Sequence, residues 1–335
     1  MQPASAPLRC QHDHPLPSEG KACICKAQEY VTYRRGLRGT GTEQRAYRRT
    51  LHRSGTGDGW ACGFHPSRWI AVVSGRVEVA GGVLYEGDCL AVMPALPSSS
   101  VDLILCDLPY GTTQNRWDSV IDLPGLWSEY RRLLKPSGAI VLTSQGAFTA
   151  RLILSNEDWF RYKLVWEKSK ATNFLNAKKQ PLRKHEDVCV FYPGKPTYNP
   201  QMGEGAAYDK GVRKDQQTGS YGDFSASHVR SEGGRYPTDV VYFKTAESEP
   251  ERTVWHSTQK PVGLGQYLIR TYSNPGDLVL DNAFGSGSFL VAAQREQRRF
   301  IGIEKNEYTE LFKGERVDCM AVAASRLGTG ERIAA

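Results

Sequence analysis

The chain has 335 residues, 40% of them hydrophobic, which is enough for one large α/β core and an additional small region. No apolar stretch approaches the ~20 residues that a membrane-spanning helix needs, and the first residues lack a secretion signal, so we expect neither a membrane protein nor a secreted one. The eight cysteines are scattered without regular spacing, which favours a reducing, cytoplasmic compartment.

The net charge of +7 is concentrated near the N-terminus, because residues 1–68 contain eleven Lys or Arg residues and five Asp or Glu residues. Residues 1–70 are also rich in Gly, Ser and Thr, and are predicted to form a flexible basic arm that favours a polyanionic partner. A solvated basic surface without a partner is the alternative. Structural zinc is a further alternative for the arm, although the ligand spacing is irregular and no metal site is assigned. Its candidate ligands are Cys10, His12, His14, Cys23, Cys25, Cys62 and His65.

Regular alternation of strands and helices begins near residue 75. Residues 135–138, Lys-Pro-Ser-Gly, predict a turn between a helix and the next strand. The order of elements predicts a doubly wound, mostly parallel sheet between two layers of helices, which is a three-layer α/β/α architecture. The predicted strands cover 76–79, 82–85, 101–106, 139–143, 162–166 and 187–192, and the predicted helices cover 89–96, 126–134 and 148–154.

Residues 193–250 interrupt this pattern with many Gly, Pro, Tyr and charged residues and no amphipathic helix. A stretch of this length inside a compact domain is usually functional or disordered, and we expect an insertion here. Regular structure then returns. The predicted strands cover 278–281 and 300–303, and the predicted helices cover 261–272, 288–295 and 308–326.

A glycine turn, Phe-Gly-Ser-Gly at 284–287, follows the predicted strand that ends at Asp281. Glycine lets the main chain approach a ligand closely because it has no Cβ. Glu304 ends the next predicted strand about 20 residues later, the spacing at which an acid binds the ribose diol of a nucleotide. Leu290 replaces the third glycine of the dinucleotide motif, which disfavours a dinucleotide. A purely structural turn and a solvated strand-end acid are the alternatives.

The tetrapeptide Asp107-Leu108-Pro109-Tyr110 follows the predicted strand 101–106. An amino group conjugated to a base ring is a poor nucleophile, and acceptors aimed at its N–H groups orient it and stabilise the positive charge that develops on methylation. Asp107 supplies a carboxylate and a main-chain carbonyl can supply a second acceptor, while Pro109 stiffens the loop and Tyr110 offers a ring for an extruded base. By itself such a tetrapeptide is a turn signal. Both loops are expected at the carboxyl edge of the sheet, where such sheets bind ligands.

These segments resemble the amino-methylating DNA methyltransferases of the permuted, β-type motif order, in which the cofactor loop follows the amino-binding loop and the recognition region. The resemblance covers roughly 82–318 and includes 256–261, His-Ser-Thr-Gln-Lys-Pro, which closely matches the family signature H-x-T-Q-K-P. It implies a Rossmann-like methyltransferase fold, S-adenosylmethionine as cofactor and double-stranded DNA as partner. Two departures are Leu108, where the family usually has Pro, and Asn282-Ala283, which replace Pro-Phe or Pro-Cys.

The resemblance also assigns the site. Asp107 and the carbonyl of Leu108 would accept hydrogen bonds from the target amine, Tyr110 would stack on the base, and Pro109 completes the catalytic loop. The implied division of the chain is the arm 1–70, a catalytic half 71–192, a target-recognition insertion 193–250 and a cofactor-binding half 251–335. Cofactor binding is assigned to Asp88, Thr258, Lys260, Asp281, Phe284, Gly285, Gly287 and Glu304.

Basic side chains in and before the inserted region are expected to contact DNA phosphates and base edges. A solvated basic face is again the alternative. The expected DNA-binding residues are Lys178, Lys179, Arg183, Lys184, Arg213 and Lys214.

Asp107 favours the adenine-N6 branch of the family, because cytosine-N4 enzymes more often carry Ser at that position. The expected function is therefore site-specific methylation of adenine N6 by base flipping, in a bacterial or phage-infected cytoplasm. The alternatives are a cytosine-N4 methyltransferase, a DNA-binding relative without catalysis and, more remotely, a small-molecule methyltransferase. A homodimer and a cognate restriction endonuclease are compatible with the sequence, which determines neither.

Overall fold

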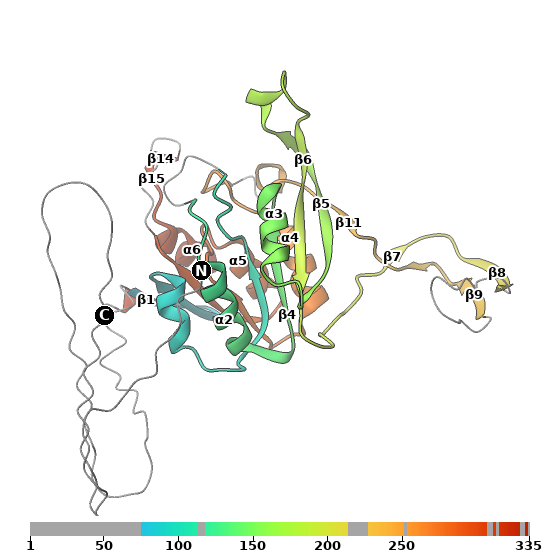
Figure 1. Ribbon diagram of the computed structural model, residues 1–335, viewed down its shortest axis with the longest axis horizontal. Helices are drawn as coiled ribbons and strands as arrows, with labels where there is room; N and C mark the ends of the chain where they lie inside the picture. The colour runs from blue at the N-terminus through green and yellow to red at the C-terminus, as the bar shows by residue number, and fades with distance from the viewer. Residues whose placement is uncertain are drawn as a thin grey trace, which may run out of the picture. The chain divides into compact units, whose positions relative to one another are not determined.

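Figure 1 shows the computed structural model, which describes residues 75–112, 118–213, 227–250, 253–306, 311–312, 315–328 and 332–333. All of these belong to one unit, which extends from Cys62 to Ala335. Ten of the strands within the described residues form a single sheet. In order across the sheet they are β11 (Val240–Phe243), β5 (Phe160–Thr172), β6 (Arg183–Phe191), β4 (Leu134–Ser144), β3 (Val101–Cys106), β12 (Leu278–Asp281), β13 (Arg299–Glu304), β2 (Gly82–Glu86), β1 (Gly75–Val79) and β16 (Arg332–Ile333).

Most strands of this sheet run in one direction. The pairs β11–β5, β4–β3, β3–β12, β12–β13 and β13–β2 are parallel, and only β6 and β1 oppose the common direction. The predicted, mostly parallel sheet is therefore confirmed. Leu103 pairs with Val279 and Ile104 with Leu280, so β3 and β12 are neighbours and their carboxyl ends lie side by side. This pairing brings the loops after Cys106 and Asp281 together.

Helices cover both faces of the sheet, because its central strands are apolar on both sides (Figure 1). In β3, Leu103 and Leu105 pack in the core beneath α4, α5 and α6, whereas Ile104 and Cys106 pack beneath α1, α2 and α3. This alternation follows from the two-residue period of a strand, and it confirms the expected α/β/α layers. The helices are α1 (Cys89–Val92), α2 (Leu123–Leu133), α3 (Ala147–Leu154), α4 (Val262–Tyr272), α5 (Ser288–Arg295) and α6 (Cys319–Leu327).

Short 3₁₀ turns complete the helical structure, at Met93–Ala95, Phe174–Asn176 and Ala246–Ser248. None of the helices in the described parts of the chain is long and apolar enough to cross a membrane.

The start of α2 and the strand after it differ from the sequence prediction. The helix begins at Leu123, three residues before the predicted range 126–134, because the Asp122 side chain accepts a hydrogen bond from the Gly125 N–H (3.0 Å) and caps the helix. The predicted turn at 135–138 is wrong, since these residues belong to β4, which begins at Leu134. A shift of register against β3 accommodates them.

The predicted helix 308–326 is wrong in its first half. Leu311–Phe312 (β14) and Glu315–Arg316 (β15) pair as antiparallel strands, and α6 begins only at Cys319. Asp318 sets this start because its side chain accepts a hydrogen bond from the Ala321 N–H (3.0 Å). The prediction followed the apolar periodicity through Gly314, although glycine is a residue type that favours turns.

The stretch 193–250 contains small sheets and one strand of the main sheet. β7 (Gly203–Glu204) pairs with β10 (Gly234–Arg235), and β8 (Tyr208–Arg213) pairs with β9 (Ser227–Ser231). β11 also lies in this stretch, and it joins the edge of the main sheet beside β5. The last part of 193–250 is therefore part of the α/β core.

β5 and β6 are longer than the predicted strands 162–166 and 187–192. Their pairing continues from Glu167 opposite His185 to Thr172 opposite Arg183, with a register shift between the two pairs. The resulting β5–β6 hairpin extends past the ends of the neighbouring strands (Figure 1). This extension places residues 172–183 next to the carboxyl edge of the sheet.

Candidate active site

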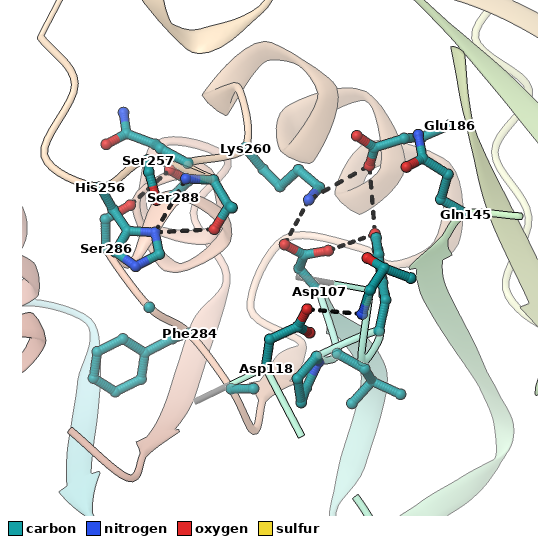
Figure 2. Close-up of a pocket in the computed structure, with 18 of the residues that line it drawn as sticks. Asp107, Asp118, Gln145, Glu186, His256, Ser257, Lys260, Phe284, Ser286 and Ser288 are labelled. Carbon is teal, nitrogen blue, oxygen red and sulfur yellow. Dashed lines mark hydrogen bonds and ion pairs between the residues drawn. The ribbon is translucent and has the colours of Figure 1, made fainter. Parts of the chain in front are cut away.

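A cavity of about 880 Å³ opens at the carboxyl ends of β3 and β12. Both predicted loops contribute to it, which fits the rule that open α/β sheets bind ligands at this edge. Figure 2 shows the polar side chains that line the cavity, among them Asp107 and Lys260. The predicted site residues that line it are Asp88, Asp107, Leu108, Pro109, Tyr110, Arg183, Thr258, Lys260, Asp281, Phe284, Gly285 and Glu304.

Asp107 is held by three side chains. Its Oδ1 accepts hydrogen bonds from the Tyr110 hydroxyl (2.7 Å) and from the Thr143 hydroxyl, and its Oδ2 accepts one from Lys260 Nζ (2.6 Å). A carboxylate offers about four acceptor positions, so three are occupied and one stays open for a further N–H donor. Asp107 is thus fixed in orientation and still able to accept from an amine in the cavity.

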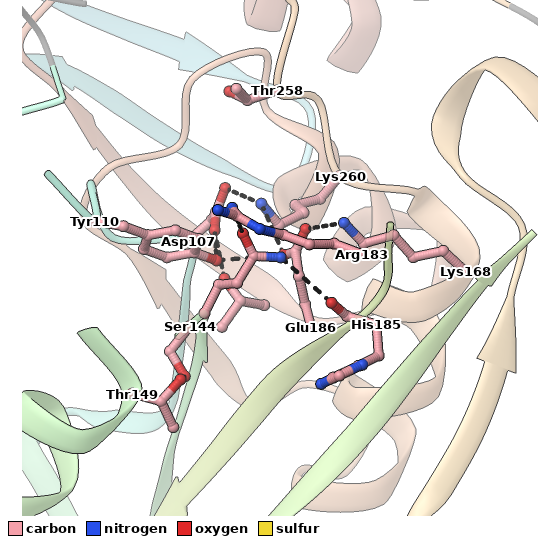
Figure 3. Close-up of polar contacts among 12 residues, drawn as sticks. Asp107, Tyr110, Ser144, Thr149, Lys168, Arg183, His185, Glu186, Thr258 and Lys260 are labelled. Atoms are coloured by element: carbon pink, nitrogen blue, oxygen red, sulfur yellow. Dashed lines mark hydrogen bonds and ion pairs between the residues drawn. The ribbon is translucent and has the colours of Figure 1, made fainter. Parts of the chain in front are cut away.

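Lys260 joins Asp107 to a second carboxylate, Glu186, on β6 (Figure 3). Its Nζ lies 2.6 Å from Asp107 Oδ2 and 3.4 Å from Glu186 Oε2, and Lys168 Nζ lies 2.5 Å from the other oxygen of Glu186. Burial alone would lower the pKa of Lys260, but Asp107 and Glu186 together raise it, so the amine stays charged. The charges of two cations and two anions therefore cancel in this cluster.

The charge of Glu186 depends on those two lysines. Burial by itself raises the pKa of a carboxyl group, but the charges of Lys260 and Lys168 lower the pKa of Glu186 below its usual value. The side chains of Glu186 and Lys168 are only 10% and 6% exposed. Removing one member of such a buried pair typically costs about 3–5 kcal/mol, since the other charge is left uncompensated.

Tyr110 lies beside this cluster, and its ring packs against a second aromatic ring. It stacks on Phe148 with ring centroids 5.2 Å apart and an interplanar angle of 28°. Burial, followed by the charges of Asp107 and Glu186, raises the pKa of Tyr110, so its hydroxyl stays protonated and donates to Asp107. The side chain of Leu108, only 3% exposed, packs into the core on the α1–α3 side. The Leu side chain that stands where the family usually has Pro is therefore part of the core.

Asp118 closes the loop that follows Tyr110. Its two carboxylate oxygens accept hydrogen bonds from the N–H groups of Gly111 (2.8 Å) and Thr112 (2.9 Å). Gly111 has φ +67°, a left-handed conformation that favours glycine. The buried Asp118 therefore fixes the chain direction immediately after the tetrapeptide 107–110.

Gly285 and Glu304 form the second part of the cavity. Gly285 has φ +52°, and its N–H donates to Glu304 Oε2 (2.7 Å). Glu304 is 7% exposed and lines the cavity, and its Oε1 accepts a hydrogen bond from the Asn306 N–H (3.3 Å). The glycine conformation and the buried acid fit the sugar and main-chain contacts of a nucleoside-containing cofactor.

Asp281 is a buried carboxyl group at the end of β12. Its pKa is raised to about 8, chiefly by burial and also by the nearby charges of Glu304 and Asp107, against the lowering effect of hydrogen bonds from the Ala283 N–H and the Cys106 thiol. Asp281 lines the cavity. A cationic group bound next to it would favour its ionised form.

His256, the first residue of the H-x-T-Q-K-P segment, is buried and lines the cavity. Its Nδ1 lies 3.0 Å from the Thr258 hydroxyl. Burial lowers the pKa of His256 to about 4, so the ring is neutral at pH 7. The segment thus contributes both a neutral ring and the charged Lys260 to the cavity (Figure 2).

Several predicted residues lie away from the cavity lining. Gly287 caps α5 with φ +76°, and a Cβ there would approach Ala323 of α6 at 3.0 Å, so this glycine serves packing between helices. Lys178 and Lys179 are exposed at the turn of the β5–β6 hairpin, and Lys184 pairs with Glu167 at 2.7 Å. Outside the described residues, or with a side chain that is not described, are Arg213, Lys214, Cys10, His12, His14, Cys23, Cys25, Cys62 and His65.

The sequence prediction missed Lys168, Glu186, Thr143 and Asp118. The two-residue period of the strand could have identified Lys168, because it follows Leu164 and Trp166 at the next inward-facing position of β5. A cation at a buried position of a strand requires an acidic partner. Glu186, Thr143 and Asp118 come from separate segments, and no local pattern marks them.

Comparison with known proteins shows which family the chain resembles. A family model for N6/N4 methyltransferases, described as DNA methylase, matches residues 101–313. The chain is 25% identical over 257 residues to the Type II methyltransferase M.HinfI of Haemophilus influenzae, a match that covers 67% of this chain and 65% of M.HinfI, just under two thirds of that protein. It is 24% identical over 317 residues to the Type II methyltransferase M.Cfr9I of Citrobacter freundii, covering 74% of this chain and 93% of M.Cfr9I.

One solved structure adds to the evidence for the fold. The structure of the PvuII DNA methyltransferase (cytosine-N4-specific) superimposes with a TM-score of 0.50 over 76% of this chain and 96% of that one. The sequence identity is 16%, so this similarity concerns the fold. It agrees with the layered sheet described above.

Proposed function

Because the chain belongs to the N6/N4-type DNA methylase family, we propose that it transfers a methyl group from S-adenosylmethionine to the N6 amino group of adenine in duplex DNA. One observation carries this proposal: Asp107, with an open acceptor position, shares a cavity with the Gly285 turn and Glu304. An amine acceptor and a nucleoside-binding turn in one cavity are the two parts that such a transfer requires.

S-adenosylmethionine, when bound, would supply an electrophilic methyl group. The adenine amine would accept this methyl group, the remainder of the cofactor would leave as a thioether, and the surplus proton of the amine would pass to solvent. Asp107 accepts a hydrogen bond from that amine and stabilises the positive charge on it, and the Leu108 carbonyl is the second proposed acceptor. Tyr110, supported by Phe148, stacks on the base.

The target base must leave the helix to reach this cavity, since Asp107 is only partly exposed. We assign cofactor contacts to Glu304, Gly285, Phe284 and Asp281, which line the other part of the cavity. Asp88 and Thr258 also line it. Lys260, which the family signature placed with the cofactor, is assigned here to Asp107 because of its 2.6 Å contact.

We assign recognition of the DNA sequence to the part of 193–250 that lies outside the main sheet, and general attraction to DNA to the basic arm 1–68. The carboxylate of Asp107 at the first position of the tetrapeptide supports adenine over cytosine as the target. Since two relatives from bacteria are named as Type II methyltransferases, we propose a role in restriction-modification in a bacterial or phage-infected cytoplasm, with a cognate endonuclease as the partner to seek.

The test is direct. Purified protein is incubated with unmethylated DNA and methyl-labelled S-adenosylmethionine, and the DNA is digested to nucleosides. The proposal expects labelled N6-methyladenine, and modification-sensitive sequencing of the same DNA would locate the methylated site. N4-methylcytosine without N6-methyladenine would assign the enzyme to the cytosine branch, and DNA binding without any transfer would identify a non-catalytic relative.

A further inference from the structure

The turn of the β5–β6 hairpin carries two adjacent apolar side chains in solvent. Phe174 and Leu175 are 79% and 97% exposed. The turn itself is well bonded: the Asn176 N–H donates to the Asn173 carbonyl (3.0 Å), and Asn176 Nδ2 donates to Asn173 Oδ1 (2.7 Å). Asn173 has φ +71°, a conformation that asparagine adopts more readily than most residues. A fixed turn therefore presents both apolar side chains outward.

Exposure of these two residues contributes nothing to the stability of the free protein. Burial of a Leu or Phe side chain usually gains free energy, and neither residue obtains that gain here. Single exposed apolar residues are common and need no partner. The informative fact is the location, because Thr172, Asn173 and Asn176 of the same turn line the active-site cavity.

Positively charged side chains lie on the same hairpin as the apolar pair. Lys178 and Lys179 are exposed there, and Lys170 is exposed with Glu247 3.8 Å away. Arg183 lines the cavity and donates to Gln145 Oε1 (2.8 Å). Apolar side chains with cations on the same hairpin match a DNA duplex, whose stacked bases lie between two rows of phosphates.

We propose that Phe174 and Leu175 form a wedge that enters the DNA duplex beside the base pair whose adenine moves into the cavity. The proposal rests on the proposed function, because it presumes that a base leaves the helix. Extrusion of a base removes its stacking and pairing contacts, and apolar side chains inserted at the vacated step replace part of the stacking. Lys178 and Lys179 would then contact the flanking phosphates.

Asn173 contributes a polar side-chain amide to the hairpin turn, directly before Phe174. Its Nδ2 is buried and has no hydrogen-bond partner among the residues that the structure describes. Because Asn173 also lines the cavity, this donor lies where the wedge meets the extruded base. An acceptor on the DNA would satisfy it.

The experiment compares wild type with the double variant Phe174→Ser/Leu175→Ser on two DNA duplexes that contain the methylation site. One duplex is fully paired, and the other has an abasic position opposite the target adenine, which removes most of the pairing to be broken. We expect the variant to lose about tenfold or more in kcat/KM on the paired duplex and much less on the abasic one, because the wedge acts on extrusion. When 2-aminopurine replaces the target adenine of the paired duplex, the rise in its fluorescence on protein binding should be smaller for the variant than for wild type.

Leu154→Ser is the matched control, since Leu154 is 68% exposed at the end of α3 and does not line the cavity. It should leave both rates unchanged, and thermal unfolding should be the same for all three proteins. Equal loss on both duplexes, or no loss on either, would overturn the wedge. A change in sedimentation of the DNA-free variant would also overturn it, in favour of contact between protein copies. If wild type methylates neither duplex, the proposed function itself fails.

Discussion

Lys260 Nζ lies 2.6 Å from Asp107 Oδ2, so the proposed amine acceptor has a buried, charged partner from a distant segment of the chain. The same ammonium group lies 3.4 Å from Glu186 Oε2. One cation is thus shared by two carboxylates, one in the loop after β3 and one in β6. Its position links the H-x-T-Q-K-P segment to the chemistry that we propose for Asp107.

Asp107→Ala should abolish methyl transfer while S-adenosylmethionine binding stays nearly intact. The change removes a fixed acceptor aimed at the target amine, and the loss of one such interaction typically costs about 10²–10³ in rate. Single-turnover methylation and calorimetry measure the two quantities separately. Asp158→Ala, at an exposed acid in the turn before β5, is the control. Activity of the Asp107 variant within a few-fold of wild type would contradict its assignment.

Lys260→Met should make activity depend on pH. Without this cation, Asp107 and Glu186 share a buried site with Lys168 alone, and repulsion between them favours retention of one proton. Since Asp107 must be ionised to accept from the amine, the rate of the variant should rise as the pH rises. Lys260→Arg keeps the charge and should keep the wild-type profile. Identical pH profiles for kcat in the Met variant and wild type would refute the role of Lys260.

Gly285→Val and Glu304→Ala should both weaken S-adenosylmethionine binding, the first more severely. Gly285 has φ +52°, and a side chain in the left-handed region costs about 1–2 kcal/mol in addition to filling space next to the ligand. Gly276→Val is the matched control, because Gly276 has φ +85° and an added Cβ would meet no atom within 4 Å. Calorimetric affinity that changes equally in all three variants would remove the argument for a cofactor contact at Gly285.

Asp281 should make the ligand-free protein less stable as the pH rises. Its pKa is raised by burial to about 8, whereas an aspartate in the unfolded chain titrates near about 4. The stabilisation from its bound proton is complete below about pH 4 and is lost as the pH rises through about 8. Urea unfolding at a series of pH values should show a steeper fall for wild type than for Asp281→Asn. Parallel curves for the two proteins would show that Asp281 is not the titrating group.

Arg213→Ala with Lys214→Ala should reduce DNA affinity without changing the affinity for S-adenosylmethionine. Each lost phosphate contact should also reduce the slope of log affinity against log salt by roughly one unit. Deletion of 1–68 should weaken DNA binding but leave the methylated sequence the same. Sequencing that found a new methylated site after this deletion would move recognition to the arm.

The strands and helices that carry the two loops were predictable because their signals are local. The apolar runs 101–106 and 278–281 and the helix 288–295 have the predicted bounds, since each is followed or preceded by a turn signal. The contact of Lys260 with Asp107 was not predictable, because the two residues are 153 positions apart. Glu186 was missed for the same reason. Local patterns locate the loops, whereas the shared cation depends on how the sheet is ordered.

The pairing of β3 with β12 also affects how the protein becomes active during synthesis. These neighbouring strands are distant in the chain, and the bond from the Leu278 N–H to Asp102 at their amino ends spans 176 positions. Contacts of such long range form late and slow the folding of a domain. A growing chain therefore exposes the loop 107–110 long before β12, the strand that completes the cavity, has left the ribosome. The proposed methylation activity should begin only when residues 278–304 have been added and folded.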